Sequence, residues 1–187
     1  APNPFYSFCS LATCKPKIRG TAQEGDWIAG VGSKVRGRDG HLVYAMKVTD
    51  TLSFNEYWDD PRFLQKRPNM YGSKKQSFGD NIYHRAGKSW VQVDSHHSLK
   101  NGKPNPSNIK NDTQADRVLI SDDFVYFGGN GPKIPTKFRN FDGHDICGGR
   151  GHKCKFPEKL VPQFEAWVRS LNSMGYCGTP LDWPKSP

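Results

Sequence analysis

Gly25-Asp-Trp-Ile-Ala-Gly-Val-Gly32, followed after a short loop by His41-Leu-Val-Tyr-Ala-Met-Lys-Val-Thr49, is the stretch that decides the fold. Both segments are short and rich in β-branched and aromatic residues, as expected of strands. The loop between them contains Lys34, Arg36 and Arg38 together with two glycines. The stretch therefore predicts a β-hairpin with a mobile, basic tip.

Further strands are predicted where the same residue types recur. These runs are Ile82–His84, Trp90–Val93, Arg117–Asp122 and Phe124–Gly128. The chain contains 19 glycines and 14 prolines, which favours many turns and short elements over long helices. We therefore predict an α+β fold, a compact β-rich barrel with few peripheral helices, as a single domain over residues 1–187.

Two helices are predicted from local signals. Ser53 with Glu56 three residues later forms a capping box, so a short helix is expected to begin there and end before Pro61. After Pro157, apolar residues recur at three- and four-residue spacing, which predicts an amphipathic C-terminal helix. Residues 99–114 are polar and are predicted to be a loop.

The composition favours a polyanionic partner. The chain has 187 residues, a formal net charge of +9 and a pI of about 9.4. Clustered Lys and Arg attract phosphate, so we favour a nucleic acid or nucleotide over a merely solvated basic surface. Five widely spaced cysteines do not form the pattern of a disulfide scaffold, and no apolar run reaches transmembrane length. We expect a cytoplasmic protein without a membrane partner, and a segment upstream of Ala1.

Residues 80–98 concentrate side chains that can bind a flat ring. A hairpin turned near Gly87 would bring the aromatic and histidine side chains of its two arms together. Tyr and Trp stack on a base, whereas Asn and His form hydrogen bonds with its edge. Because neighbouring strand residues face opposite sides, His96 and His97 are not expected to act on one atom. The alternative is a histidine bonded to a nearby loop. We predict a base-binding pocket from Asn81, Tyr83, His84, Trp90, His96, His97 and Ser98.

Evidence for catalysis is limited. Cys14 is followed by Lys15, Lys17 and Arg19, and nearby cations lower the pKa of a thiol. No histidine can be assigned to Cys14 from the sequence, and a buried structural thiol is the favoured interpretation. No catalytic residue is therefore predicted.

The segment Phe141-Asp-Gly-His-Asp-Ile-Cys-Gly-Gly-Arg-Gly-His-Lys-Cys154 contains both metal-ligand and phosphate-binding residue types. His144, Cys147, His152 and Cys154 suit tetrahedral zinc, but their spacing matches no usual zinc motif. Alternatively, backbone N–H groups of the glycines, with Arg150 and His152, hold a phosphate, or the segment is a plain structural loop. We predict no cofactor, with zinc at these four residues as the less favoured alternative.

Two resemblances cover the chain. Residues 25–49 resemble the Gly-Asp-strand-loop-strand core of the PUA-like superfamily, which includes EVE, YTH and ASCH domains that bind RNA or a flipped modified base. Further motifs span the full length: Ala1-Pro-Asn-Pro-Phe, Cys14-Lys-Pro-Lys-Ile-Arg, Gly79-Asp-Asn-Ile-Tyr-His, His96-His-Ser, Asp116-Arg-Val-Leu-Ile-Ser, Tyr126-Phe-Gly, Gly149-Arg-Gly-His and Gly178-Thr-Pro-Leu-Asp-Trp. With these motifs the chain resembles the nucleotide-modification-associated domain family, second type, of bacteria and their phages. That resemblance implies an additional strand before Ala1.

The resemblances and the basic charge together imply recognition of nucleic acid containing a modified base, or of a modified nucleotide. The implied context is DNA modification or phage defence. Phosphate contacts are predicted for Lys15, Lys17, Arg19, Arg36, Arg38, Lys74, Lys75, Arg150 and His152. The alternative is an enzyme that acts on modified nucleotides or nucleic acid by histidine acid–base or metal-assisted chemistry.

Overall fold

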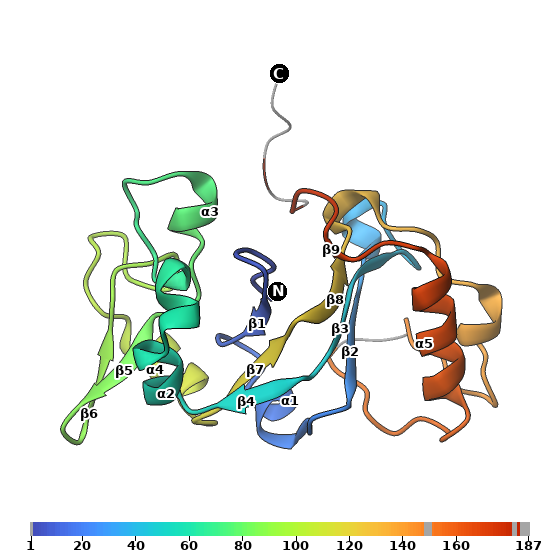
Figure 1. The fold of residues 1–187 in the computed structure, drawn as a ribbon, viewed down its shortest axis with the longest axis horizontal. Helices are drawn as coiled ribbons and strands as arrows, with labels where there is room; N and C mark the ends of the chain where they lie inside the picture. The colour runs from blue at the N-terminus through green and yellow to red at the C-terminus, as the bar shows by residue number, and fades with distance from the viewer. Residues whose placement is uncertain (1, 148–150, 181–182, 184–187) are drawn as a thin grey trace. The chain divides into compact units, whose positions relative to one another are not determined.

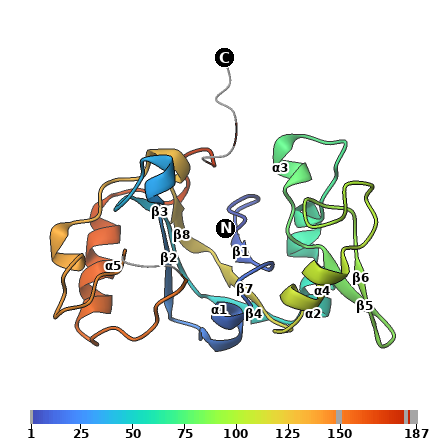
Figure 2. The same ribbon diagram turned by 180° about the vertical axis from the view of Figure 1, so that it is seen from behind.

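The computed structural model describes residues 2–147, 151–180 and 183, and the chain divides into two compact units. Unit 1 comprises Ala1–Asp26 and Val48–Asp122, and unit 2 comprises Trp27–Lys47 and Asp123–Pro187. Figure 1 and Figure 2 show the chain from opposite sides. Each unit thus combines two segments that are far apart in the sequence, so the units cannot be recognised as consecutive domains along the chain.

Unit 1 contains a three-stranded antiparallel sheet, a separate hairpin and short helices (Figure 1). The sheet has the order β1 (Cys9–Leu11), β7 (Val118–Ser121), β4 (Asp50–Leu52). The hairpin consists of β5 (Tyr83–Ala86) and β6 (Ser89–Gln92). The helices are α1 (Pro16–Thr21), α2 (Phe54–Asp59), the 3-10 helix η2 (Pro61–Lys66), α3 (Lys74–Ser77) and α4 (Pro106–Asp112).

Local capping signals explain two of these helices. The capping box at α2 is confirmed, because Ser53 accepts a hydrogen bond from the Glu56 N–H and Glu56 accepts one from the Ser53 N–H. α4 lies within the segment predicted to be a loop. Asn105 caps it by accepting from two backbone N–H groups, and Pro106 occupies the first turn. The loop prediction for residues 99–114 is therefore wrong over α4.

The core of unit 1 packs one face of the sheet and hairpin against α2. Its buried residues are Ala12, Phe54, Tyr57, Phe63, Ile82, Tyr83, Val118 and Ile120. A buried polar group fixes the chain leading into β1: Lys66 Nζ donates to Asn3 O, Asn3 Oδ1 and Phe8 O at 2.9–3.0 Å. The segment that ends at Cys14 is thereby held on the core.

Unit 2 consists of a four-stranded sheet and one long helix. The sheet has the order β2 (Trp27–Val31), β3 (Leu42–Lys47), β8 (Asp123–Tyr126), β9 (Gly175–Tyr176), with β9 parallel to β8. The helix is α5 (Leu160–Ser170), and the 3-10 helices are η1 (Lys34–Arg36), η3 (Gly128–Asn130) and η4 (Thr136–Phe138). The predicted β2–β3 hairpin and C-terminal helix are both confirmed, and Leu160, Phe164 and Val168 are the buried face of α5.

The α+β class is confirmed. The strands of the described residues form two open sheets and a hairpin, and none of these closes into a barrel. The predicted PUA-like barrel therefore stays a prediction. Within the described part of the chain, no helix has both the length and the apolar character needed to cross a bilayer.

Candidate active site around Cys14

Cys14 lies on a strained turn between β1 and α1. Its φ is 55° and that of Lys15 is 46°, so two consecutive residues with side chains adopt the left-handed conformation. Each such residue costs on the order of 1–3 kcal/mol, and this strain persists only where the surroundings fix it. Asp112 Oδ1 accepts from the Cys14 N–H at 2.8 Å, and Arg19 Nε donates to Cys14 O at 2.9 Å. Both backbone polar groups of Cys14 are therefore held in place.

His97 faces Cys14 and Asp112. Its Nδ1 lies 3.1 Å from Asp112 Oδ2, and its ring lies beside the Cys14 thiol. One ligand atom from each of the three residues lies within 4.8 Å of the other two. They form a compact triangle in which the carboxylate touches both the cysteine backbone and the histidine ring.

The turn that carries His97 is itself fixed. The His97 N–H donates to Ser95 Oγ at 3.2 Å, and the Ser95 N–H donates to Ser98 Oγ at 3.0 Å. The His97 carbonyl accepts from Asn108 Nδ2 at 2.7 Å and from Gln92 Nε2 at 3.3 Å. The imidazole is thus positioned by contacts to α4 and β6.

Asp112 is a buried carboxylate whose two oxygens each accept two hydrogen bonds. Oδ1 accepts from the Cys14 N–H and from Asn111 Nδ2, and Oδ2 accepts from the Tyr83 hydroxyl at 2.9 Å and from His97. Burial by itself would raise the pKa of Asp112, but hydrogen bonds from His97, Tyr83 and the Cys14 N–H outweigh it and lower that pKa. Asp112 is therefore ionised near neutral pH.

The pKa values of Cys14 and His97 move in opposite directions. The hydrogen bond from His97 lowers the pKa of the Cys14 thiol. The bond to Asp112, followed by the bond to Cys14, raises the pKa of His97 to about 9. Both shifts favour transfer of the proton from the Cys14 thiol to the imidazole. A thiolate paired with an imidazolium is the state that an enzymatic cysteine nucleophile requires.

Arg19 fastens the elements of the site to one another. Its side chain is fully buried, and besides Cys14 O it donates to Ala115 O and Arg117 O at 2.7 Å and to Asp112 O. Arg19 was predicted to contact phosphate. Since its guanidinium is inaccessible and occupied by carbonyls, we assign it a structural role.

Cys14, His97 and Asp112 are also the group of potential metal ligands in the described residues. Metal binding would have to displace hydrogen bonds, because Asp112 already accepts four of them and His97 Nδ1 is bonded to Asp112. A tetrahedral site would need a further ligand beyond these three. The donor set therefore fits a hydrogen-bonded triad better than a metal centre.

The predicted base-binding residues are dispersed. Asn81 and Tyr83 are buried in the core of unit 1: Asn81 Nδ2 donates to Tyr57 O and Phe63 O, and the Tyr83 hydroxyl donates to Asp112. Ser98 fastens the His97 turn. Asn81 and Tyr83 therefore offer no ring or polar edge at the surface, and the half-buried Ser98 hydroxyl is used within the turn.

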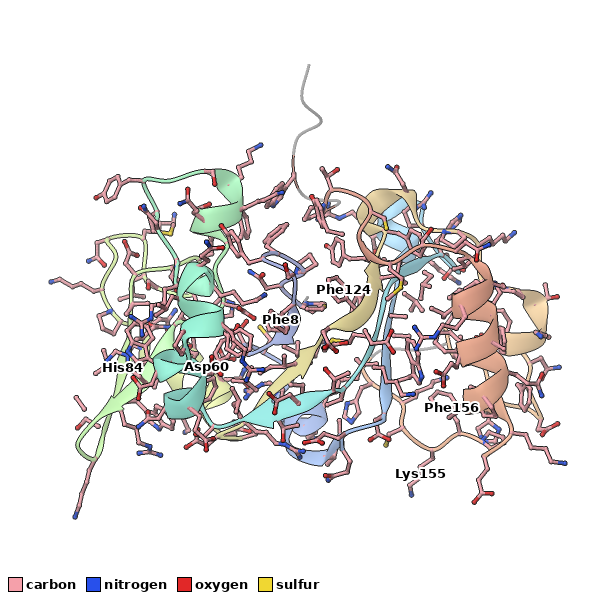
Figure 3. The ribbon with its side chains drawn as sticks, viewed as in Figure 1. Phe8, Asp60, His84, Phe124, Lys155 and Phe156 are labelled. Carbon is pink, nitrogen blue, oxygen red and sulfur yellow. The ribbon has the colours of Figure 1, made fainter. Side chains whose placement is uncertain are left out.

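His84, Trp90 and His96 are more accessible, but each already stacks on another ring or cation. The ring centroid of His84, a residue labelled in Figure 3, lies 4.1 Å from that of Trp58 on α2. The Arg85 guanidinium carbon lies 3.9 Å from the Trp90 ring centroid, and the ring centroids of His96 and Phe78 are 4.0 Å apart. His96 and His97 contact different partners, Phe78 and Asp112, and the two residues lie in a turn and not in a strand.

The remaining predicted residues are divided between the two units. Lys15, Lys17, Lys74 and Lys75 are exposed in unit 1, whereas Arg36, Arg38 and His152 belong to unit 2. Arg150 lies outside the described residues. The residues suggested for zinc are His144, Cys147, His152 and Cys154, and all four lie in the part of the chain that the structure describes. Their ligand atoms do not form a group like that of Cys14, His97 and Asp112.

A family model described as nucleotide modification associated domain 2 matches residues 1–187. The chain belongs to the nucleotide modification associated domain 2 family. No curated protein and no solved structure matches the chain. The family description associates this protein with nucleotide modification, as the resemblance implied.

Within this family member, sequence reasoning singled out Cys14 and His97 separately and missed Asp112. The Asn105-Pro106 pair was a signal for α4. It would have placed Asp112 at the end of a helix, although it could not have paired that helix with Cys14.

Proposed function

We propose that this protein is an enzyme of nucleotide modification in which Cys14 is the nucleophile, His97 the acid–base group and Asp112 the residue that orients both. The supporting observation is the hydrogen-bonded group of Cys14, His97 and Asp112 on a strained turn. Backbone strain of this kind clusters at functional sites. The reaction class that this constellation performs is acyl transfer at an ester or amide carbonyl.

The proposed reaction has two steps. The Cys14 thiolate attacks the carbonyl carbon and forms a C–S bond. The tetrahedral intermediate then collapses, the bond to the leaving oxygen or nitrogen breaks, and the His97 imidazolium donates its proton to the leaving group. In the second step, water or an amine attacks the thioester, His97 takes the proton, and the C–S bond breaks. The acyl group leaves as an acid or an amide, and the thiolate–imidazolium pair is restored.

The charge around Cys14 supports a phosphate-bearing substrate. The segments that form the site, residues 13–21 and 95–112, contain several cations and a single acidic residue, the buried Asp112. Lys15, directly before α1, Lys17 on α1 and Lys110 on α4 are exposed. A positive rim of this kind attracts nucleotides and nucleic acid. We therefore propose an acyl group carried on a nucleotide as the substrate, in a DNA-modification or phage-defence setting in the cytoplasm.

Recognition of a modified base without chemistry is the second candidate. It is favoured by the accessible rings of unit 1, namely His84, Trp90 and His96, beside exposed lysines. A reader of this type needs stacking and edge contacts but no nucleophile. Base recognition alone does not explain the strained turn and the proposed ion pair at Cys14, so we prefer the enzyme.

A small acyl donor tests the enzyme directly. With p-nitrophenyl acetate, we expect a burst of p-nitrophenolate of at most one equivalent and an acetyl group on Cys14 in the intact protein. Cys14→Ala abolishes the burst, and His97→Ala slows it by about 100-fold or more. Cys177→Ala, which removes an exposed thiol of unit 2, leaves it unchanged. Equal acetylation of Cys14 and Cys177 would contradict the proposal.

Two further measurements separate the alternatives. Deoxynucleosides acylated on the exocyclic amine should be deacylated by the wild type and not by Cys14→Ala. Binding of these nucleosides without any turnover in the wild type would favour the reader. In metal analysis of the purified protein, we expect the wild type and Cys14→Ala to have the same metal content. One equivalent of metal in the wild type that is absent from Cys14→Ala would contradict the nucleophile and support a metal centre.

A further inference from the structure

Tyr71 is displayed on the surface of unit 1 by a well-defined turn. Its side chain is 100% exposed. The Tyr71 N–H donates to Asn69 Oδ1 and the Gly72 N–H to Asn69 O, both at 3.0 Å, while the Asn69 N–H donates to Gln76 O. A capping box between Ser73 and Gln76 begins α3 immediately afterwards. The turn that exposes this ring is therefore fixed by hydrogen bonds.

The loop that carries Tyr71 is closed at its base. The Asn81 N–H donates to Lys66 O at 3.0 Å, so the two ends of the loop meet. Gly79 makes this possible, because a Cβ there would lie 2.3 Å from Lys66 O and 2.7 Å from Pro68 N. In Figure 1 and Figure 2, α3 lies at the end of unit 1 opposite the tip of the β5–β6 hairpin. Tyr71 is thus held on a projecting, anchored loop.

The exposed part of the same loop is basic. Residues 66–81 contain four cations, and their single acidic residue, Asp80, is buried. Lys66 is also buried, whereas Lys74 and Lys75, which follow Tyr71 by three and four residues, are exposed. An exposed aromatic ring beside exposed lysines is the combination with which proteins bind single-stranded nucleic acid. The ring stacks on a base, and the lysines contact phosphates.

The loop also contacts the turn that carries the proposed acid–base residue. Phe78, at the end of α3, stacks on His96 with ring centroids 4.0 Å apart and an interplanar angle of 28°. His96 directly precedes His97. A chain bound along the loop would therefore lead towards the turn that contains His97.

We propose that residues 67–79 bind single-stranded nucleic acid, with Tyr71 stacked on an unpaired base and Lys74 and Lys75 against phosphates. This inference rests on the proposed function, because it makes the substrate of Cys14 a nucleotide within a polynucleotide. Single strands are specified because the bases of a duplex stack on one another and leave no face for Tyr71.

Fluorescence anisotropy with a labelled oligothymidylate tests the surface, in the Cys14→Ala background so that no reaction intervenes. We expect Tyr71→Ala to weaken binding by about 10-fold, as loss of one base–aromatic stack does, and Tyr71→Phe to retain it. Lys74→Ala and Lys75→Ala should each reduce the dependence of affinity on salt. Lys155→Ala, at an exposed lysine of unit 2 (Figure 3), is the matched control and should have no effect.

A single-stranded RNA of the same length shows which sugar is preferred, and a DNA duplex shows whether unpaired bases are required. Unchanged affinity of Tyr71→Ala, or equal binding of the duplex, would overturn the proposal. This outcome is independent of the nucleophile, since acetylation of Cys14 by p-nitrophenyl acetate involves no nucleic acid. Conversely, strong binding by an unreactive protein would support the surface and overturn the enzyme.

Discussion

At the scale of single residues, the decisive feature is that Cys14 has polar partners on both its backbone and its side chain. Asp112 accepts a hydrogen bond from its N–H, Arg19, five residues along the chain, donates to its carbonyl, and the His97 ring lies beside its thiol. A structural thiol needs none of these. Cys9 shows the contrast: its thiol is fully buried on β1, and burial raises its pKa to about 12.

Alkylation should therefore discriminate among the cysteines. Because the bond from His97 lowers the pKa of Cys14, while burial raises that of Cys147 to about 11, iodoacetamide should modify Cys14 before Cys147 at pH 7. The pH profile of Cys14 modification should have its midpoint below the ordinary thiol range. Peptide mapping after short exposures measures this.

His97→Ala is the matched variant for that profile. Without the imidazole, the midpoint of Cys14 alkylation should move upward, whereas the modification of Cys177 should not change. Identical profiles in the wild type and His97→Ala would show that His97 does not lower the pKa of Cys14 and would contradict the proposed ion pair.

The residues of the site were only partly predictable. Cys14 stood out by its cations and His97 by its neighbours, yet the two are joined by tertiary contacts that no local pattern encodes. Asp112 gave no signal of its own. Tyr83 was predicted to stack on a base, but its side chain is buried in the core. Aromatic residues occur both in binding pockets and in cores, and the burial that distinguishes the two depends on the whole fold.

At the scale of elements, Arg19 connects α1 to the chain around the C-terminal end of α4. Its guanidinium takes four carbonyls from three places in the sequence, Cys14, Asp112, and the strand entry at Ala115 and Arg117. Helices as short as α1 and α4 are marginal on their own, so their placement depends on such contacts. The planar fork of Arg, with five donors, suits this role better than the ammonium of Lys.

Removing this guanidinium should cost both stability and reactivity. Arg19→Leu leaves four carbonyls without their charged donor, which we expect to lower the free energy of unfolding by about 3 kcal/mol or more. Urea denaturation measures the loss, and alkylation of Cys14 should lose its selectivity in the same variant. Lys17→Leu, at an exposed position of the same helix, should change stability by about 0.5 kcal/mol or less. Similar stabilities for the two variants would refute the role given to Arg19.

Elements with local signals were predicted well, and those without were not. The β2–β3 hairpin, the capping box of α2 and the amphipathic α5 each carry their signal within a few residues. The pairing of β1 with β7 joins strands from near the two ends of unit 1. Alternating residues indicate that a segment is a strand, but they do not indicate its partner, so the sheet order could not be read from the sequence.

At the scale of the whole molecule, the proposed ion pair has a consequence for stability against pH. Between the unfolded pKa of His97, 6.5, and its folded pKa of about 9, folding adds a proton to the imidazole. In the range between the lowered pKa of Cys14 and its unfolded value of 9.0, folding removes a proton from the thiol. Where the two ranges overlap, the two effects cancel, so the pair gives the folded state no net dependence on pH there.

Cys14→Ala should break this cancellation. Asp112, the largest cause of the raised His97 pKa, remains, so the folded variant still binds the extra proton above pH 6.5 while no thiol offsets it. Its stabilising contribution is complete below pH 6.5 and is lost as the pH rises through the folded pKa. The unfolding free energy of Cys14→Ala should therefore fall relative to the wild type between pH 7 and 8.5, by at most about 1.4 kcal/mol per pH unit. Urea denaturation at several pH values measures the difference, in which groups away from Cys14 cancel. In a His97→Gln background, Cys14→Ala should no longer change the pH dependence of the unfolding free energy. Parallel curves of unfolding free energy against pH for the wild type and Cys14→Ala would show that no proton is shared between Cys14 and His97.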